Sequence, residues 1–203
     1  MHLVCLDLEG VLVPEVWINV AERTGIEALR DTTRDIPDYD VLMRQRLRLL
    51  DEHRLTLSDI QAVIGDMGPL PGACEFLDSL RARGPVVILS DTYYEFAEPL
   101  MRQLDWSTLF CHRLDVDGND RVTGYRLHMP DHKRAAVVAF RDLKFATITV
   151  GDSYNDTTML AEADHGLLFR APPNVIEEFP QFPSISGFDE LAAAIRDLDA
   201  GIA

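Results

Sequence analysis

Three short β-prone runs of this chain each end directly in polar side chains, and this repetition constrains the fold more than any other feature. Such runs of four or five residues predict buried strands. They are residues 3–6 before Asp7-Leu8-Glu9-Gly10, residues 86–89 before Ser90-Asp91-Thr92, and residues 146–150 before Gly151-Asp152-Ser153-Tyr154-Asn155-Asp156. Because ligands bind at the carboxyl ends of strands in an open α/β sheet, we expect these polar groups to meet in one site.

Helix and strand patterns alternate from residue 71 onwards. The predicted helices cover residues 73–83, 94–104, 132–143, 157–163 and 188–198, and further strands are predicted at 108–114, 166–169 and 184–186. A tight turn at residues 116–122 between extended segments predicts a β-hairpin. Alternation of this kind is typical of an α/β fold. We therefore predict a doubly wound, Rossmann-like parallel sheet, covered by helices on both faces.

A helical segment interrupts this pattern directly after the first strand. Apolar periodicity predicts helices from about residue 15 to Gly25, over residues 39–53 and over residues 56–67, the last with Thr56 or Ser58 as its cap. A polar link containing a proline, residues 32–38, separates the first two, and Gly68-Pro69-Leu70-Pro71-Gly72 ends the segment. We predict a catalytic core of residues 1–14 and 69–203, with residues 15–68 inserted as a small helical cap domain.

Composition and charge narrow the possible functions. The net charge of −15 argues against nucleic-acid binding, which needs a basic face, although a bound metal can still attract a small anion. The chain has no apolar run of the roughly 20 residues that would span a membrane, and no signal-peptide pattern, so we expect a cytoplasmic protein. The three cysteines, Cys5, Cys74 and Cys111, are widely spaced and predict buried apolar side chains rather than a disulfide or zinc site.

The polar groups at the strand ends suit phosphoryl transfer. Asp7 is placed to attack phosphorus and carry an aspartyl-phosphate, and Glu9 to exchange the proton of the leaving oxygen. Asp7 and Asp152 could together hold Mg²⁺, which prefers carboxylates, water and phosphate oxygens. Ser90 can donate to a phosphoryl oxygen and Lys133 can offset its charge. Taken singly, an acidic turn at Asp7 or a surface lysine at Lys133 would be an ordinary solvated group.

The segment Gly151-Asp152-Ser153-Tyr154-Asn155-Asp156 is more specific than the other motifs. Its acid and amide groups directly follow a strand and are rarely only a turn. Within it, Asp156 could support a metal ion from behind its ligands or orient Lys133. This segment therefore carries most of the functional prediction.

Together, Asp7-Leu8-Glu9-Gly10-Val11, Ser90, Lys133 and Gly151-Asp152-x-x-Asn155-Asp156 resemble the four signature motifs of the haloacid dehalogenase-like hydrolases. The helical insert resembles the cap of the phosphoserine phosphatase branch, and the full chain is most similar to its ThrH-type bifunctional phosphoserine phosphatases/phosphoserine:homoserine phosphotransferases. The resemblance implies Asp7 as nucleophile, with Asp152 and the Glu9 carbonyl beside it on Mg²⁺. It also implies Ser90, Lys133 and Asn155 around the phosphate, and it allows a homodimer.

For the cap, the resemblance implies that Glu15 meets the substrate ammonium and Arg46 its carboxylate. These contacts fit the physics, since an amino-acid head group needs one anion and one bidentate cation. Arg44 and Arg48 are close alternatives to Arg46, and an exposed helix charge is the ordinary interpretation of any of the three.

Glu9 departs from the pattern, because most of the family has aspartate there. Our hypothesis is that the longer side chain favours transfer of the phosphoryl group to an alcohol over hydrolysis. The spacing to Glu15 is also one residue shorter than the usual phosphoserine phosphatase pattern.

The leading prediction is a Mg²⁺-dependent phosphotransferase that passes the phosphoryl group of phosphoserine to water or homoserine. A phosphatase for another small phosphate ester is the enzymatic alternative. A non-enzymatic receiver-like signalling domain also uses a phosphorylated aspartate, a hydroxyl residue and a lysine, but it would need neither the helical insert nor the segment from Gly151 to Asp156.

Overall fold

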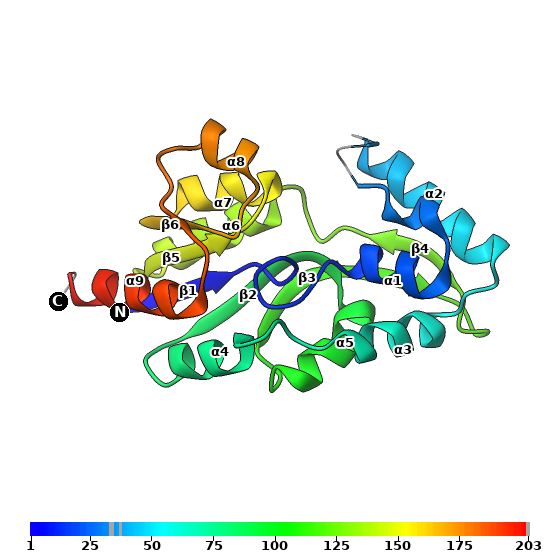
Figure 1. Cartoon of the computed structure of the whole chain (residues 1–203), viewed down its shortest axis with the longest axis horizontal. Coiled ribbons are helices and arrows are strands. Elements are labelled where there is room, and N and C mark those ends of the chain that lie inside the picture. Colours follow the sequence, from blue (N-terminus) through cyan, green and yellow to red (C-terminus); the bar gives the residue numbers. More distant parts are fainter. Residues whose placement is uncertain (33–34, 37, 202–203) are drawn as a thin grey trace.

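The computed structural model of the chain describes residues 1–32, 35–36 and 38–201; positions 33, 34 and 37 of the predicted polar link lie outside the described residues. Seven strands in the described part form one sheet in the order β4-β3-β2-β1-β5-β6-β7 (Figure 1). Neighbouring strands are parallel except β3 and β4, which form the predicted hairpin. The bounds are β1 His2–Leu6, β2 Val86–Tyr93, β3 Thr108–Val116, β4 Val122–Arg126, β5 Ala146–Gly151, β6 His165–Phe169 and β7 Ser184–Ile185.

The predicted helices are confirmed with shifts of a few residues at their ends. They are α1 Val16–Thr24, α2 Tyr39–Glu52, α3 Leu57–Met67, α4 Ala73–Arg81, α5 Tyr94–Gln103, α6 His132–Asp142, α7 Thr157–Glu162 and α9 Phe188–Ala200. Thr56 and Asp59 form a reciprocal capping box at the start of α3, which settles the choice of cap. Three short helices lay outside the prediction: η1 Glu27–Arg30, η2 Tyr154–Asp156 and α8 Pro173–Glu178.

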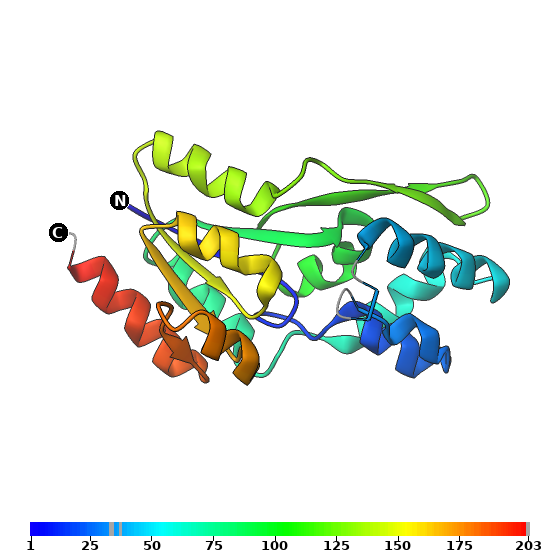
Figure 2. The same cartoon turned by 90° about the horizontal axis from the view of Figure 1, so that it is seen from above.

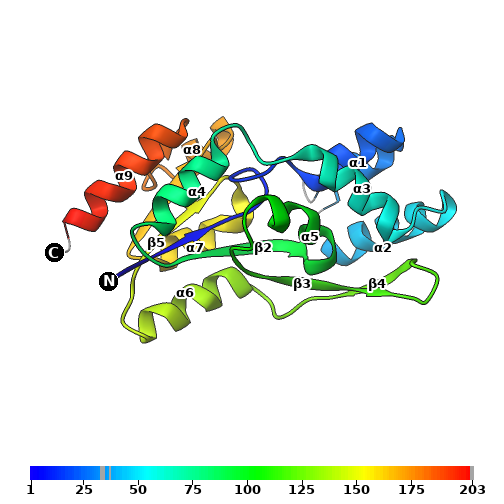
Figure 3. The same ribbon diagram turned by 90° about the horizontal axis from the view of Figure 1, so that it is seen from below.

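Helices cover both faces of the sheet because side chains alternate along each strand. On β1, Leu3 and Cys5 join an apolar cluster with α6, α7 and α8, whereas Val4 and Leu6 join a cluster with α4, α5 and α9. Figure 3 shows α4 and α6 on opposite sides of the strands. The doubly wound α/β prediction is therefore confirmed.

The cysteines follow the prediction in part. All three are free; Cys5 and Cys111 are buried, and Cys74 is only half-buried. Burial raises the pKa of the Cys5 thiol to about 12, as expected for an unreactive core side chain. None of the helices in the described part of the chain combines the length and the apolar composition that crossing a bilayer requires.

The strand β1 lies at the switch point of the sheet. The strands β2, β3 and β4 follow on one side of it, and β5, β6 and β7 follow on the other. It pairs with β2 on one edge and with β5 on the other. The three polar motifs follow or end these three central strands, so their side chains emerge at the same end of the sheet. The fold thus brings together segments that are up to 145 residues apart in the sequence, from Asp7 to Asp152.

The helices α1, α2 and α3 lie together beyond the carboxyl end of β1, next to the hairpin (Figures 1 and 2). Polar contacts join the hairpin to these helices: Arg121 pairs with Asp51, Tyr125 pairs with Asp40, and Asp120 accepts from the Leu57 and Ser58 N–H groups at 2.8 and 2.9 Å. The Leu70 N–H, where the chain returns to the core, donates to the Leu12 carbonyl at 2.8 Å. The chain segments that enter and leave the helical insert therefore lie side by side.

Candidate active site

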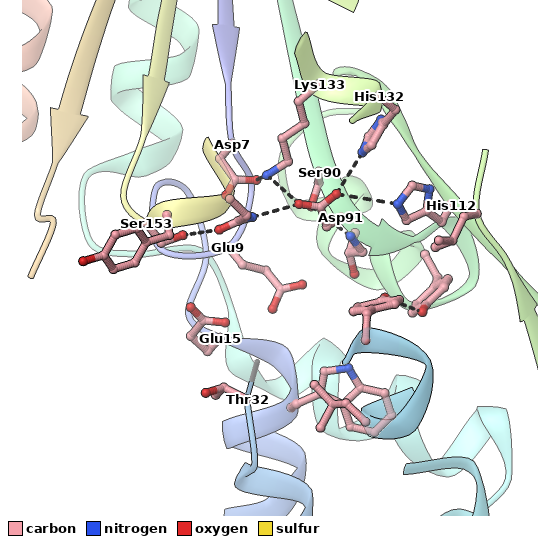
Figure 4. A pocket seen from close by; sticks show the side chains of 18 of the residues that line it. Asp7, Glu9, Glu15, Thr32, Ser90, Asp91, His112, His132, Lys133 and Ser153 are labelled. Atoms are coloured by element: carbon pink, nitrogen blue, oxygen red, sulfur yellow. Dashed lines mark hydrogen bonds and ion pairs between the residues drawn. The ribbon is translucent and has the colours of Figure 1, made fainter. Parts of the chain in front are cut away.

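A cavity of about 550 Å³ opens at the carboxyl ends of β1, β2 and β5 and extends to α1 and α2. It is lined by eight of the predicted site residues: Asp7, Glu9, Glu15, Arg46, Ser90, Lys133, Asp152 and Asn155. Figure 4 shows Asp7, Ser90 and Lys133 on the core side of this cavity and Glu15 on the side of the inserted helices. The remaining predicted residues, Gly151 and Asp156, lie directly behind the lining.

Asp7 follows β1 and is 4% exposed. Its Oδ1 accepts from the Leu8 N–H at 2.7 Å and lies 3.0 Å from Lys133 Nζ. Burial, and then the nearby carboxylate of Asp156, hold the pKa of Asp7 well above its usual range, while Lys133 opposes this. The fold therefore keeps a carboxylate oxygen at the cavity wall at an electrostatic cost that a bound cation would offset.

Lys133 lies at the start of α6 and is 2% exposed. Its ammonium contacts three carboxylates, Asp156 at 2.8 Å, Asp7 at 3.0 Å and Asp91 at 3.2 Å. Burial acts to lower the pKa of Lys133, but Asp156 and Asp7 hold it well above its usual range. Lys133 is therefore a fixed positive charge inside the site and not a solvated surface lysine.

Asp156 is fully buried and joins two parts of the site. Its Oδ1 accepts from Lys133, and its Oδ2 accepts from the backbone N–H groups of Asp152 at 3.0 Å and Ser153 at 3.2 Å. A Cβ atom on Gly151 would come within 2.3 Å of the Asp156 side chain, so only glycine leaves room for this contact. The sequence interpretation that Asp156 orients Lys133 agrees with these hydrogen bonds.

The carboxylates of Asp7, Asp152 and Asp156 offer oxygens within 4.8 Å of one another. Both oxygens of Asp156 already accept protein hydrogen bonds, which leaves Asp7 and Asp152 as the carboxylates available to ligate a metal ion. Burial and the charge of Asp156 raise the pKa of Asp152 to about 7. Two hard oxygen donors that repel each other in a partly buried site fit a divalent cation such as Mg²⁺.

Gly10 allows Asp152 to approach the loop after β1. It has φ of +77°, and a Cβ atom there would lie 2.4 Å from the Asp152 carboxylate. Gly25, at the end of α1, has a similar φ of +72° but nothing within 4 Å. The two glycines therefore share the same backbone strain on substitution but differ in their surroundings.

We expect Gly10→Ala to weaken Mg²⁺ binding at least tenfold, because the new methyl group must displace the Asp152 carboxylate. Gly25→Ala is the matched control: both changes cost about 1–2 kcal/mol of left-handed backbone strain, but only Gly10→Ala touches the carboxylates. Titration calorimetry with Mg²⁺ measures the difference. Equal Mg²⁺ affinity in the two variants would show that Asp152 does not depend on the space beside Gly10.

Glu9 lies two residues after Asp7, with its side chain directed toward α1. Its Oε2 accepts from the Val16 N–H at 2.8 Å, at the first turn of that helix. Burial, and then the charge of Glu15, raise the pKa of Glu9 to about 7. A carboxyl group of this pKa can both give and take a proton near neutral pH.

Arg46 is the one buried residue among the three neighbouring arginines of α2, and it lines the cavity, whereas Arg44 and Arg48 are exposed. Its guanidinium stacks 4.5 Å from the centre of the Trp17 ring, and its Nη2 donates to the Asp31 carbonyl at 2.8 Å. Its buried Nε has no hydrogen-bond partner among the described residues. A buried guanidinium with a donor left over is suited to bind an anionic ligand group.

Several cavity residues lay outside the prediction. Asp91, His112 and His132 form a polar cluster beside Lys133, and the Tyr39 and Tyr93 hydroxyls hydrogen-bond to each other at 2.6 Å. Asn155, predicted to face the phosphate, donates to Asp91 Oδ2 at 2.8 Å. Asp91 and His132 are adjacent to the predicted Ser90 and Lys133 and could have been identified from those positions; His112 carries no comparable sequence signal.

Comparison with known proteins agrees with this geometry. The family model of the haloacid dehalogenase-like hydrolases matches residues 1–164. A phosphoserine phosphatase of Pseudomonas syringae pv. tomato is 66% identical to this chain, over 94% of the chain and 81% of that protein. The phosphoserine phosphatase ThrH of Pseudomonas aeruginosa is 63% identical, over 94% of the chain and 93% of that protein.

A solved structure supports the fold. The phosphoserine phosphatase from T. onnurineus superposes with a TM-score of 0.72 at 22% identity, over 96% of this chain and 94% of that one. Given the family match, the two close relatives and the shared fold, this chain belongs to the haloacid dehalogenase-like hydrolases.

Proposed function

We propose that this hydrolase removes the phosphoryl group from phosphoserine through a phosphorylated Asp7. The observation that carries the proposal is that one cavity holds both the carboxylates and lysine suited to phosphoryl transfer and an acid–arginine pair suited to an amino-acid head group. The names of the two close relatives, both phosphoserine phosphatases, support the same substrate.

In the first step, an Asp7 oxygen attacks phosphorus and the bond from phosphorus to the seryl oxygen breaks. Glu9 protonates that oxygen, so serine leaves as a neutral alcohol. Ser90, Lys133 and Asn155 hold the phosphoryl oxygens, and Lys133 offsets part of their charge. A Mg²⁺ ion held by Asp7, Asp152 and the Glu9 carbonyl would supply further charge neutralisation there. In the second step, Glu9 takes a proton from the incoming water or alcohol, whose oxygen attacks phosphorus. The bond from phosphorus to the Asp7 oxygen breaks, which frees the Asp7 carboxylate and releases phosphate or the new phosphate ester.

At the other end of the cavity, Glu15 would bind the substrate ammonium and Arg46 its carboxylate. Glu15 precedes α1 at the rim of the cavity, and Arg46 reaches it from α2. The stacking of Arg46 on Trp17 fixes the plane of the guanidinium, which favours a two-point contact with a carboxylate. This arrangement would select an amino-acid phosphate over other phosphate esters.

We expect Arg46→Lys to raise the KM for phosphoserine by about 10- to 100-fold, because lysine keeps the charge but loses the stacked two-point contact. The KM for p-nitrophenyl phosphate, which has no amino-acid head group, should change less than threefold. Arg48→Lys, on the same helix but exposed, is the control and should leave both constants unchanged. An equal rise in KM for the two substrates would contradict the assignment of Arg46 to the substrate carboxylate.

We also propose that residues 15–68 act as a cap that closes over the cavity. The hinges would be near residues 13–14 and 68–72, where the outgoing and returning chain meet at the hydrogen bond from Leu70 to Leu12. Closure would exclude water from the phosphorylated Asp7 and position the second acceptor.

The finer proposal is that homoserine competes with water as the acceptor, and that Glu9 favours this transfer. Shortening the side chain, as in Glu9→Asp, would move the carboxyl group by about one methylene away from the acceptor oxygen. We expect the variant to form less phosphohomoserine per inorganic phosphate than the wild type, measured by phosphorus NMR in a single tube. An unchanged ratio of the two products would refute the role of Glu9 in choosing the acceptor.

The first experiment is phosphorus NMR of the protein with Mg²⁺ and phosphoserine, with and without homoserine. Inorganic phosphate in the first tube supports the phosphatase activity, and phosphohomoserine in the second supports transfer. If phosphoserine is unchanged in both tubes, the substrate proposal is wrong, and the same cavity would have to act on another small phosphate ester.

A further inference from the structure

Asp91, which the proposed mechanism does not use, contacts two of the three predicted phosphate-binding residues, Lys133 and Asn155. Its Oδ2 accepts from Asn155 Nδ2 at 2.8 Å and lies 3.2 Å from Lys133 Nζ. A phosphoryl oxygen held by Lys133 and Asn155 would approach the same ammonium and amide groups. Figure 4 shows the Asp91 side chain next to Ser90 and facing Lys133.

The positive charge of Lys133 is shared among three carboxylates. Lys133 Nζ donates a hydrogen bond to Asp156 Oδ1 at 2.8 Å and forms ion pairs with carboxylate oxygens of Asp7 and Asp91 at 3.0 and 3.2 Å. A phosphoryl oxygen at Lys133 would therefore compete with these carboxylates for the same ammonium group. The question is which of the three moves most easily.

Asp91 is the carboxylate most able to move. The side chains of Asp7 and Asp156 are 6% and 0% exposed and accept backbone N–H groups, whereas the side chain of Asp91 is 41% exposed. Rotation of the Asp91 carboxylate costs no buried backbone hydrogen bond. Lys133 can then exchange Asp91 for a phosphoryl oxygen with its other two contacts intact.

Two buried histidines hold the other oxygen of this carboxylate. Asp91 Oδ1 lies 3.1 Å from His132 Nε2 and 3.6 Å from His112 Nε2. The His128 N–H donates to His112 Nδ1 at 3.1 Å, so the ring proton of neutral His112 sits on Nε2 and points at Asp91. The histidine pair thus offers the carboxylate donors that do not depend on Lys133 or Asn155.

The same cluster, Asp91 with His112 and His132, has the residue types of a metal site. The hydrogen bond from His128 argues against that interpretation. A metal-bound histidine normally donates its second ring N–H, whereas His112 accepts at Nδ1 and would have to lose its only proton to bind a metal at Nε2. A hydrogen-bonded anchor for Asp91 fits the cluster better.

We propose that Asp91 sets the affinity of the site for phosphate by competing with a phosphoryl oxygen for Lys133 and Asn155, and that the histidine pair receives its carboxylate when phosphate binds. This inference rests on the proposed function for the identity of the phosphate-binding donors. Burial acts to raise the pKa of Asp91, but Lys133 and hydrogen bonds from His112, His132 and Asn155 hold it below its usual range, so the competing group is an anion. Such a device would let product phosphate leave readily, because weaker phosphate binding means faster dissociation.

The test is titration calorimetry of inorganic phosphate into the protein in Mg²⁺ buffer. We expect Asp91→Ala and Asp91→Asn to bind phosphate about tenfold more tightly than the wild type, since a competing charged hydrogen bond is removed. Asp131→Asn is the matched control: it removes the same charge from the same cavity lining, at a side chain 39% exposed that contacts Arg134 instead of Lys133. This control should change phosphate affinity less than twofold.

A second variant shifts affinity in the opposite direction. His132→Phe removes a donor to Asp91 Oδ1, so the carboxylate should hold Lys133 and Asn155 more strongly and phosphate should bind several-fold more weakly. In Asp91→Ala/His132→Phe, the histidine change should have no further effect, since its partner is gone. Weaker phosphate binding in Asp91→Ala, or the same affinity as in Asp131→Asn, would overturn the proposal.

This test and that of the proposed function can fail separately. Phosphate binding is measured without turnover, so failure to hydrolyse phosphoserine would leave the affinities of the Asp91 variants as informative as before. Conversely, hydrolysis of phosphoserine with unchanged phosphate affinity in Asp91→Ala would retain the phosphatase and reject the role of Asp91.

Discussion

Replacing Asp7 by asparagine should abolish turnover while making the protein more stable. Asparagine has nearly the same size and can still accept the Leu8 N–H, but its amide cannot attack phosphorus. Loss of a catalytic nucleophile typically lowers kcat by about 10⁴- to 10⁶-fold. We expect a fall of at least about 10⁴-fold with phosphoserine or p-nitrophenyl phosphate in Mg²⁺ buffer.

Although Asp7→Asn should lower activity, it should raise the stability of the fold, because the Asp7 carboxylate is an unfavourable buried anion when no cation is bound. Its pKa is raised on folding, mainly by burial and the charge of Asp156, so ionisation above the unfolded pKa destabilises the folded state. Removing the charge should therefore raise Tm at neutral pH in EDTA, by about 2–4 °C for each kcal/mol gained. Added Mg²⁺ should stabilise the wild type more than the variant and narrow the difference.

Asp131→Asn is the control for both measurements, because it removes an aspartate from the cavity lining without touching Asp7 or Lys133. It should keep kcat within about twofold and should not raise Tm. If Asp7→Asn retained substantial activity, Asp7 would not be the nucleophile. If its Tm fell in EDTA, the ion pair with Lys133 would outweigh the burial of the Asp7 charge.

The sheet was predictable because strand signals of this chain are local and repeated. Each central strand is a short β-prone run, and its burial on both faces follows from that composition. The end of β2 was not predicted correctly. The predicted strand stops at residue 89, but the observed strand continues to Tyr93, which pairs with His112 after an irregularity. The polar residues 90–92 lie within this irregularity and resemble a loop in the sequence, and the pairing with β3 resumes at Tyr93.

The helix α8 was missed for a related reason. The pair Pro172-Pro173 at its start resembles a loop, but Pro173 occupies the first position of the helix, where the missing N–H costs nothing. With only six residues, Pro173–Glu178 is also too short to show a clear apolar period.

The site residues that belong to a sequence motif could be predicted. Those that reach the site only through tertiary packing were harder to predict. Asp7, Lys133 and Asp152 come from segments with recognisable spacing, and they line one cavity. The choice of Arg46 over its neighbours could have been firmer, since it lies three and four residues from the buried Met43, Leu42, Leu49 and Leu50 on one face of α2. By contrast, His112 reaches Asp91 only because β3 lies beside β2, and nothing in the sequence around it indicates this contact.

Replacing Lys133 by methionine should destabilise the fold more than any other single change in the site. Lys133 is buried against three carboxylates, and removing it leaves them without a positively charged partner. Breaking a buried ion pair from one side typically costs about 3–5 kcal/mol, because the remaining charge stays buried. We expect a loss of this size in urea unfolding, together with at least a 100-fold loss in kcat/KM from the missing phosphate contact.

Lys144→Met is the matched control, because Lys144 is the only other lysine of the chain and is exposed at the end of α6. The same substitution there should change the free energy of unfolding by less than about 0.5 kcal/mol. A second comparison separates stability from chemistry. Adding Asp156→Asn to Lys133→Met removes one of the stranded charges and should restore about 1–3 kcal/mol of stability without restoring turnover. A double variant less stable than Lys133→Met alone would show that Asp156 acts mainly through its bonds to the Asp152 and Ser153 backbone, and that the charge balance around Lys133 is not what holds this end of the sheet together.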